Sequence, residues 1–220
     1  MIKAIVFDFD GTIVDTETAW YYAFQQAYES CGAELTLETF AQCIGTSHDH
    51  FNPYEYINTL LEKPVDADIF RKQVHDRHSV LMENEALRPG IIEILQAARA
   101  AGLKIGLATS SKREWIDKYL ELHNLQDYFE CIHTMENVKK VKPDPELYNQ
   151  VLDCLGVRGD EAIALEDSPN GAKAAVQAGM YCVVIPNSIT KTLPFGEVHL
   201  RVDTLEGMDY ESLFTQTFKK

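Results

Sequence analysis

The sequence contains no long hydrophobic run. Its first apolar segment, residues 4–7, ends at Asp8, and nowhere do eighteen apolar residues follow one another. A membrane-spanning helix needs about 20 apolar residues, and a secretory signal needs an apolar stretch of about 7–15 after a basic start. The sequence therefore predicts neither a membrane span nor a signal peptide, and we expect the protein to reside in the cytoplasm.

Basic residues are also scarce. The 220 residues include 20 lysines and arginines against 34 aspartates and glutamates, which gives a formal net charge of −14. Binding to a nucleic-acid backbone or to an anionic membrane surface depends on lysine and arginine. We therefore expect no nucleic-acid partner and no membrane partner. No pattern in the sequence sets the oligomeric state, and a monomer is our expectation.

Cysteine is rare and follows no pattern. The cysteines are odd in number, lie far apart and include no C-x-x-C pair; they are Cys31, Cys43, Cys131, Cys154 and Cys182. Disulfide frameworks and zinc sites have even numbers or regular spacings. We therefore predict reduced thiols that pack as small hydrophobic groups. With 45% hydrophobic residues, a chain of this length can bury a full core without disulfides.

Short apolar segments alternate with amphipathic helical segments over most of the chain. The predicted strands are residues 3–8, 104–109, 131–134, 162–166 and 181–185, and the predicted helices are residues 90–101, 112–123, 144–155 and 169–178. This alternation is typical of a parallel sheet with crossover helices. We predict an α/β fold with a Rossmann-like, doubly wound parallel sheet.

Residues 17–84 interrupt this alternation. They contain helical patterns and no convincing strand, with predicted helices at residues 17–31, 36–44, 53–62 and 66–83. We therefore predict two domains. Residues 1–16 and 85–220 form the sheet domain, and residues 17–84 form a helical domain inserted after its first strand.

Polar residues gather where the predicted strands end. Asp8 and Asp10 follow the first strand and Thr109 closes the second, while a loop carries Lys142 and the pair Glu166–Asp167 ends the fourth. In open parallel sheets, ligands bind at the carboxyl ends of the strands. We therefore expect these side chains to share one site.

The expected site is rich in carboxylates. Four of them at one edge would repel one another unless a cation lay between them. Oxygen ligands without cysteine or histidine nearby favour magnesium over zinc. The amine of Lys142 and the hydroxyl of Thr109 suit a phosphate group bound beside such a metal.

These motifs, taken in order, resemble those of a known family. D-F-D-G-T at residues 8–12, the threonine that closes the second strand, K-P-D-P at residues 142–145 and L-E-D-S-P-N-G at residues 165–171 are similar to the motifs of the haloacid dehalogenase superfamily of phosphohydrolases. The resemblance covers essentially the whole chain. The helical insertion resembles the cap domain of the β-phosphoglucomutase-like branch.

The resemblance implies a role for each motif residue. Asp8 is then the nucleophile that forms an aspartyl-phosphate, and Asp10 is the general acid and base. Thr109, Ser110 and Lys142 are expected to hold the phosphoryl oxygens.

The resemblance also implies a bound magnesium ion. Its expected ligands are Asp8, the backbone carbonyl of Asp10 and Asp167, with Glu166 binding it directly or through water. The implied activity is a magnesium-dependent phosphatase that hydrolyses a small phosphorylated metabolite, such as a sugar phosphate or a similar monoester.

The cap residues decide between a phosphatase and a phosphomutase. The resemblance implies that β-phosphoglucomutase-type enzymes carry an arginine after the G-x-S of the cap and a histidine in the first cap helix. Here these positions hold His48 and Trp20, which favours a phosphatase because no arginine is fixed there to hold a second phosphate. Arg71 or Arg77, in another cap helix, could take the place of that arginine, so the phosphomutase stays an open alternative. We expect substrate specificity to depend on Trp20, Thr46, His48 and Arg77.

Three other hypotheses are less favoured. A zinc site built from His48, His50, His75 and His78 is possible in principle, but nothing in the sequence brings the two pairs together. A dehalogenase of this superfamily lacks the second aspartate and needs no metal. A non-catalytic regulatory relative should have broken motifs, and none is broken here.

Overall fold

The computed structural model describes residues 1–46, 51–83 and 85–215. A six-stranded parallel sheet forms its centre, with the strand order β3-β2-β1-β4-β5-β6. The strands are β1 (Ala4–Phe7), β2 (Lys104–Ala108), β3 (Cys131–His133), β4 (Ala162–Glu166), β5 (Tyr181–Val184) and β6 (Leu200–Arg201). The predicted doubly wound sheet is confirmed.

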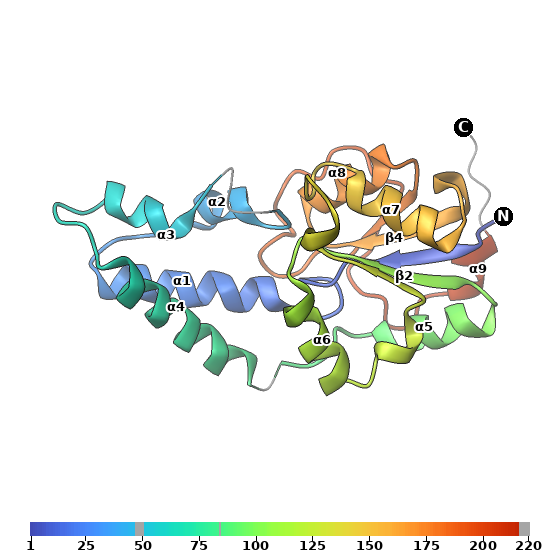
Figure 1. Cartoon of the computed structure of the whole chain (residues 1–220), viewed down its shortest axis with the longest axis horizontal. Helices are drawn as coiled ribbons and strands as arrows, with labels where there is room; N and C mark the ends of the chain where they lie inside the picture. The colour runs from blue at the N-terminus through green and yellow to red at the C-terminus, as the bar shows by residue number, and fades with distance from the viewer. Residues whose placement is uncertain (47–50, 84, 216–220) are drawn as a thin grey trace.

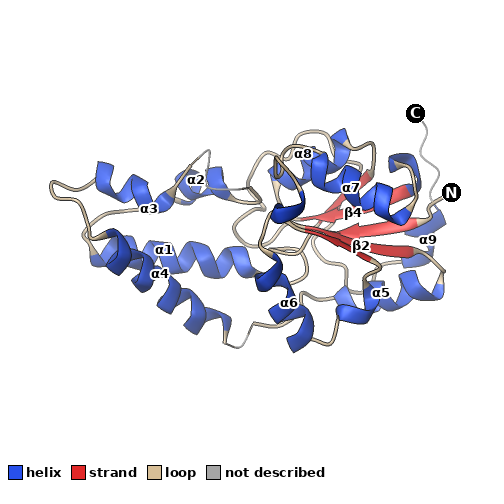
Figure 2. Cartoon of the chain, in the orientation of Figure 1, coloured by secondary structure: helices blue, strands red, loops and turns tan. Residues whose placement is uncertain are grey.

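Helices cover both faces of the sheet (Figure 2). On one face lie α5 (Ile91–Ala100), α6 (Arg113–Leu122) and α9 (Tyr210–Thr215), and on the other lie α7 (Glu146–Leu155) and α8 (Pro169–Gln177). Side chains alternate along a strand, so Ile5 and Phe7 of β1 pack against the first group while Ala4 and Val6 pack against the second. Both faces are therefore apolar, as a central parallel strand requires.

The remaining helices form a separate lobe at one end of the sheet (Figure 1). They are α1 (Thr16–Ser30), α2 (Leu37–Phe40), α3 (Pro53–Tyr56) and α4 (Ala67–Met82). The long helices α1 and α4 begin at aspartate caps, because the carboxylates of Asp15 and Asp66 accept backbone hydrogen bonds from the first turns. An aromatic cluster that includes Phe24, Tyr28 and Phe70 fills the lobe. The domain boundaries at residues 16/17 and 84/85 stay a prediction.

One strand and one α-helix of the sheet domain were not predicted. Strand β6 has two residues and α9 has six, and neither is long enough to produce a hydrophobic period. Two predicted cap helices are also shorter than expected, because α2 and α3 each give way after one turn to a 3₁₀ turn, at residues 41–43 and 57–59. Among the described residues, no helix is both long and apolar enough to cross a membrane.

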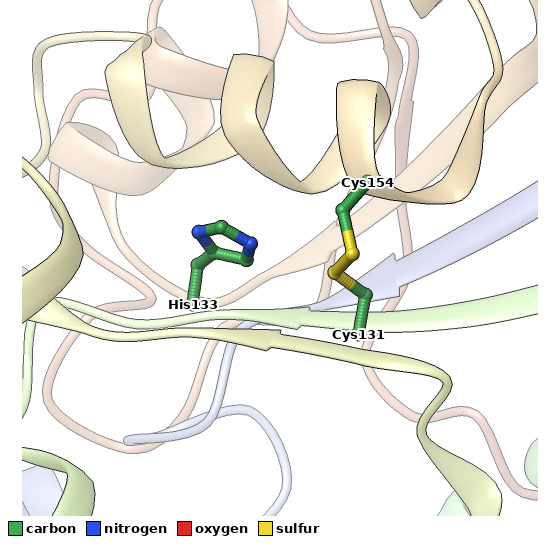
Figure 3. A group of neighbouring side chains, drawn as sticks. All are labelled: Cys131, His133 and Cys154. Atoms are coloured by element: carbon green, nitrogen blue, oxygen red, sulfur yellow. A yellow bond between two sulfur atoms is a disulfide. The ribbon is translucent and has the colours of Figure 1, made fainter.

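The prediction that all cysteines are reduced is wrong for one pair. Cys131 of β3 and Cys154 of α7 form a disulfide, with their Cα atoms 6.4 Å apart (Figure 3). The two residues are 23 positions apart and share no motif, so only the packing of α7 on the edge strand brings them together. Cys31, Cys43 and Cys182 are free, as predicted.

Candidate active site

The loop after β1 places two carboxylates at the carboxyl edge of the sheet. Asp8 is buried, and Phe9 turns into the core. Gly11 has φ +83°, and a Cβ there would lie 2.1 Å from Asp167 Oδ2, so only glycine allows the loops after β1 and β4 to approach this closely. The hydroxyl of Thr12 lies between the two carboxylates and has Asp8 Oδ2 at 3.2 Å and Asp167 Oδ1 at 3.3 Å.

Lys142 provides a buried positive charge within this site. Its side chain is 1% exposed, and its Nζ donates to Asp8 Oδ1 at 2.5 Å and to Glu166 Oε1 at 2.6 Å. Burial alone would lower the pKa of Lys142, but the carboxylates of Asp8 and Glu166 outweigh burial and hold that pKa above its ordinary value. The amine therefore stays charged.

Three buried carboxylates lie close together here, and two of them contact Lys142. Asp8, Glu166 and Asp167 are buried, and each offers an oxygen within 4.8 Å of the others. Burial, opposed by Lys142, raises the pKa of Asp8 to about 7. Burial, together with the charges of Asp8 and Glu166, raises the pKa of Asp167 well above its ordinary value. The negative charge exceeds what one amine offsets, and the all-oxygen donor set fits a hard divalent cation.

Glu166 is fixed from several sides. Besides the Lys142 amine, its Oε1 accepts a hydrogen bond of 2.5 Å from the hydroxyl of Tyr148. A Cβ on Gly171 would lie 1.9 Å from Glu166 Oε2, so glycine is required where α8 passes this carboxylate. Glu166 therefore positions Lys142 as well as contributing an oxygen to the acidic group.

The carboxylate of Asp10 is held by groups from three different elements. Its Oδ1 accepts from Thr16 Oγ1 at 2.8 Å and from Trp115 Nε1 at 2.9 Å. Its Oδ2 accepts from Ser111 Oγ at 2.6 Å and, at 3.4 Å, from Thr109 Oγ1. The sequence analysis did not identify Thr16, Ser111 or Trp115. Only the hydroxyl run after Thr109 gave a local signal for Ser111.

A cavity of about 470 Å³ opens beside Asp10, between the sheet loops and the helical lobe. Aromatic and apolar side chains form most of the wall on the side of the helical lobe, and polar groups lie near the sheet. The lining residues are Asp10, Glu17, Trp20, Phe24, Phe40, Cys43, Thr46, Tyr54, Arg71, His75, Ser110, Ser111, Lys112, Trp115 and Met135. The cavity can hold a small metabolite next to the acidic site.

The predicted specificity residues have different positions. Trp20 and Thr46 line the cavity, and Thr46 Oγ1 also donates to the backbone carbonyl of Lys142 at 2.5 Å. Arg77 is not among the lining residues, whereas Arg71 is, with its guanidinium 4.4 Å from the ring centre of Tyr54. His48 lies outside the described residues.

Glu17 is a further cavity residue that sequence analysis missed. Burial and the charge of Asp10 raise the pKa of Glu17 well above its ordinary value, although a weak backbone hydrogen bond of 3.4 Å from Gly45 opposes this. The position carries no motif in the sequence. A carboxyl group here can bind a hydroxyl group of a ligand.

The histidines of α4 make ring contacts. His78 is buried and stacks on Trp20 with the ring centres 3.5 Å apart, and His75 Nε2 lies 3.2 Å from the Tyr54 hydroxyl. In the described part of the chain, neither residue belongs to a group of side chains suited to hold a metal ion. His48 and His50, the other half of the zinc hypothesis, lie outside that part.

Comparisons with known proteins agree with this geometry. The family model described as haloacid dehalogenase-like hydrolase matches residues 5–185. The protein named "Putative phosphatase YhcW" of Bacillus subtilis (strain 168) is 42% identical over 209 residues, covering 95% of this chain and 94% of that protein. The "Phosphorylated carbohydrates phosphatase" of Thermotoga maritima is 32% identical over 181 residues, covering 81% and 82%.

A solved structure is also similar over nearly the whole chain. It is the crystal structure of a CbbY mutant from Rhodobacter sphaeroides in complex with xylulose-(1,5)bisphosphate. The sequences are 27% identical, the TM-score is 0.76, and the match covers 95% of this chain and 97% of that one.

Proposed function

The chain belongs to the haloacid dehalogenase-like hydrolases, in the β-phosphoglucomutase-like branch, and on that premise we propose that it is a magnesium-dependent phosphatase of a small phosphorylated metabolite, such as a sugar phosphate or a similar monoester. One observation carries the proposal. The buried carboxylate of Asp8 lies 2.5 Å from the Lys142 amine, with Asp10 beside it at a cavity.

Similar proteins support the substrate class. The named relatives include phosphatases of phosphorylated carbohydrates and of hexitols. The cavity volume of about 470 Å³ suits a metabolite of that size and excludes a folded protein substrate.

Asp8 acts first in the proposed reaction. Its carboxylate oxygen attacks the phosphorus atom, a bond from Asp8 to phosphorus forms, and the bond from phosphorus to the alcohol oxygen breaks. Lys142, already in contact with Asp8, stabilises the ionised carboxylate and the charge on the phosphoryl oxygens. Thr109, directly after β2, supplies its hydroxyl to those oxygens, and Ser110, in the following loop, supplies its hydroxyl and backbone N–H.

Asp10 moves the proton in both steps. In the first step it gives a proton to the departing alcohol oxygen, and in the second it takes one from the water that attacks the aspartyl-phosphate. The donors from Thr16, Ser111 and Trp115 fix the direction of the carboxyl group toward the cavity. Phosphate then leaves, and Asp8 is regenerated.

Magnesium fits the acidic group of this site. We propose that Asp8, the backbone carbonyl of Asp10 and Asp167 hold it, with Glu166 as a direct or water-mediated ligand, since these groups are oxygen donors with excess negative charge. When bound, the ion neutralises that charge and orients the phosphate group. The Asn187 amide, 2.9 Å from Asp167 Oδ2, fixes the orientation of that carboxylate.

A phosphomutase is the second candidate. Arg71 at the cavity wall is a guanidinium that can bind a second phosphate group, which a mutase requires. A non-catalytic relative is disfavoured because Asp8, Asp10 and Lys142 are all in place. We further propose that the protein acts in the cytoplasm as a monomer.

The test is a panel of phosphomonoesters that includes both glucose phosphates, followed for phosphate release and for isomer interconversion. We expect release that requires magnesium. Isomer interconversion without phosphate release would show a phosphomutase rather than a phosphatase. Full activity in excess chelator would contradict the magnesium requirement.

Two variants test whether Asp167 binds the metal and Lys142 binds the phosphoryl group. Asp167→Asn should raise the apparent magnesium constant, because an amide oxygen binds the cation less strongly than a carboxylate. Lys142→Ala should raise KM and lower kcat because it removes a positive charge from the phosphoryl group. It should not weaken magnesium binding, because it removes a cation that contacts the proposed metal ligands Asp8 and Glu166. Identical magnesium titrations of the two variants would contradict this division.

A further inference from the structure

We propose that the Cys131–Cys154 disulfide is a reversible redox modification site that controls the loop carrying Lys142. The disulfide joins β3 to α7, and residues 134–145, which include Lys142, form the connection between them. Only the predicted effect on catalysis rests on the proposed function. The effect on the loop itself does not.

One face of α7 holds this loop. In the first turn, the carboxylate of Glu146 accepts hydrogen bonds from the backbone amides of Lys139, at 3.2 Å, and Lys140, at 3.1 Å. One turn further along the helix, Gln150 Nε2 donates to the backbone carbonyl of Asn137 at 3.1 Å. Residues four apart lie on the same helix face. The helix therefore holds the loop by hydrogen bonds from two successive turns.

The disulfide is the third attachment on that face. Cys154 follows Gln150 by four residues, as Gln150 follows Glu146, and its sulfur is bonded to Cys131 at the start of β3. The bond closes the chain segment that begins on β3, passes through Lys142 and returns along α7. Reduction leaves α7 packed on the sheet through its buried apolar side chains but removes the covalent closure of that segment.

The two cysteines differ in exposure. Cys154 is an exposed residue, whereas Cys131 is 5% exposed. A low-molecular-weight thiol therefore attacks the Cys154 sulfur, forming a mixed disulfide there and releasing Cys131 as a thiolate that takes up a proton. A second thiol molecule attacks the added sulfur, which frees the Cys154 thiol and yields the small disulfide. The net reaction converts one protein disulfide and two small thiols into two protein thiols and one small disulfide.

His133 lies beside the bond. Figure 3 shows its imidazole next to the disulfide, and one ring nitrogen and the two sulfurs lie within 4.8 Å of one another. Its Nδ1 is 3.0 Å from Gln150 Oε1. With Nδ1–H donating to that amide oxygen, Nε2 is the nitrogen that can accept a hydrogen bond from a thiol.

The loop connects the disulfide to the catalytic lysine. Lys142 lies two residues after Lys140, and its Nζ must reach Asp8 and Glu166 at the same time. A loop held at fewer points samples more positions, so the amine spends less time in this geometry. We therefore expect the reduced protein to bind phosphate groups less tightly than the oxidised protein.

The experiment compares the full-length protein after treatment with glutathione disulfide and after treatment with a dithiol reductant, in chelator so that no thiophilic metal binds the freed thiols. Intact mass and thiol counting give the redox state. Reduction should lower the thermal midpoint by about 5–10 °C. It should speed amide exchange in residues 134–145 by about tenfold, with no comparable change in β1 or β4. With magnesium restored, KM for the best phosphomonoester should rise by about threefold.

Cys154→Ser, at an exposed position, should match the reduced protein under both treatments, and Cys131→Ala provides a second variant in case one fails to fold. Cys31→Ser, which changes a free thiol in the cap, should respond as the wild type does.

Failure to form the disulfide under oxidation, or equal thermal midpoints and exchange rates in both states, overturns the proposal. An unchanged KM overturns the link to catalysis. Absence of phosphate release in both states would contradict the proposed function while the exchange data still decide the switch.

Discussion

At the residue scale, the position of Asp10 depends on side chains far away in the sequence. Thr16 begins the first cap helix, Ser111 follows β2, and Trp115 is in α6, yet all three donate to the same carboxylate. None of them belongs to the motif that contains Asp10. A general acid needs this type of support, because its proton must point at one oxygen of the substrate.

Replacing Trp115 with phenylalanine should weaken the acid step selectively. The change removes the Nε1–H that lies 2.9 Å from Asp10 Oδ1 and keeps an aromatic ring at the cavity. We expect kcat to fall by about tenfold for substrates with poor leaving groups and by less for aryl phosphates, whose leaving groups need no proton. The measurement is kcat for a series of phosphomonoesters with different leaving-group pKa values.

Two variants control this measurement. Asp10→Asn should show the same dependence on the leaving group in stronger form. Trp20→Phe changes another indole of the same cavity that does not hold Asp10, so it should alter KM without that dependence. Equal losses on good and poor leaving groups for Trp115→Phe would mean that its hydrogen bond does not support the acid step, and equal losses for Asp10→Asn would exclude Asp10 as the acid.

At the scale of elements, the close packing of α7 on the sheet sets the position of the lysine loop. Gly106 of β2 allows this contact, because a Cβ there would lie 2.6 Å from Cγ1 of Val151. The helix in turn carries Tyr148, whose hydroxyl donates to Glu166, and holds the loop that contains Lys142. The packing of the sheet and the position of the proposed catalytic lysine therefore depend on the same helix.

Gly106→Ala should destabilise the protein by about 1–3 kcal/mol, since overpacking a tight contact forces the helix to shift. The added methyl group should cost less when Val151 is also shortened to alanine, so the double variant should lose less than the sum of the two single variants. Denaturant unfolding of the four proteins measures this coupling. Additive losses would show that α7 does not rest on Gly106 as described.

The sequence predicted elements better than it predicted contacts. Strands β1 to β5 are visible because each is a short apolar run with a turn or cap nearby, whereas β6 is too short to show a pattern. Asp8 and Asp167 could be predicted to lie together because they follow β1 and β4 directly, and the topology gathers those strand ends at one edge, whereas Lys142 lies in the loop between β3 and α7 and was predicted from its motif. Trp115 and the Cys131–Cys154 disulfide depend on packing between elements, and no local spacing encodes that.

At the scale of the whole molecule, the buried carboxylates make stability depend on pH and on metal. Burial raises the pKa of Asp8 from its ordinary value of 3.8 to about 7. Between those values the folded state keeps a proton that the unfolded state has lost, so this group makes the protein less stable as pH rises. Histidine works in the opposite direction, because burial lowers the pKa of His78 to about 3.

The contribution of Asp8 to the pH dependence of stability is therefore measured as the difference between the wild type and Asp8→Asn. In chelator, we expect the wild type to lose stability relative to Asp8→Asn as pH rises from 4 to 8. Magnesium should stabilise the wild type more at pH 8 than at pH 5, because binding favours ionised ligands. Thermal midpoints of both proteins across this range, with and without magnesium, give the two slopes. If the thermal midpoints of the two proteins changed with pH in parallel, the pKa of Asp8 would not be raised by burial as described.

The central claim is that Asp8 forms the bond to phosphorus. The most direct measurement is the rate of phosphate release by Asp8→Asn at saturating magnesium, beside the wild type and beside Asp203→Asn, which changes an exposed aspartate outside the site. We predict that Asp8→Asn loses at least about 10³-fold in kcat while its circular dichroism spectrum stays unchanged, and that Asp203→Asn keeps the wild-type rate. A well-folded Asp8→Asn protein that releases phosphate at near the wild-type rate would contradict the account.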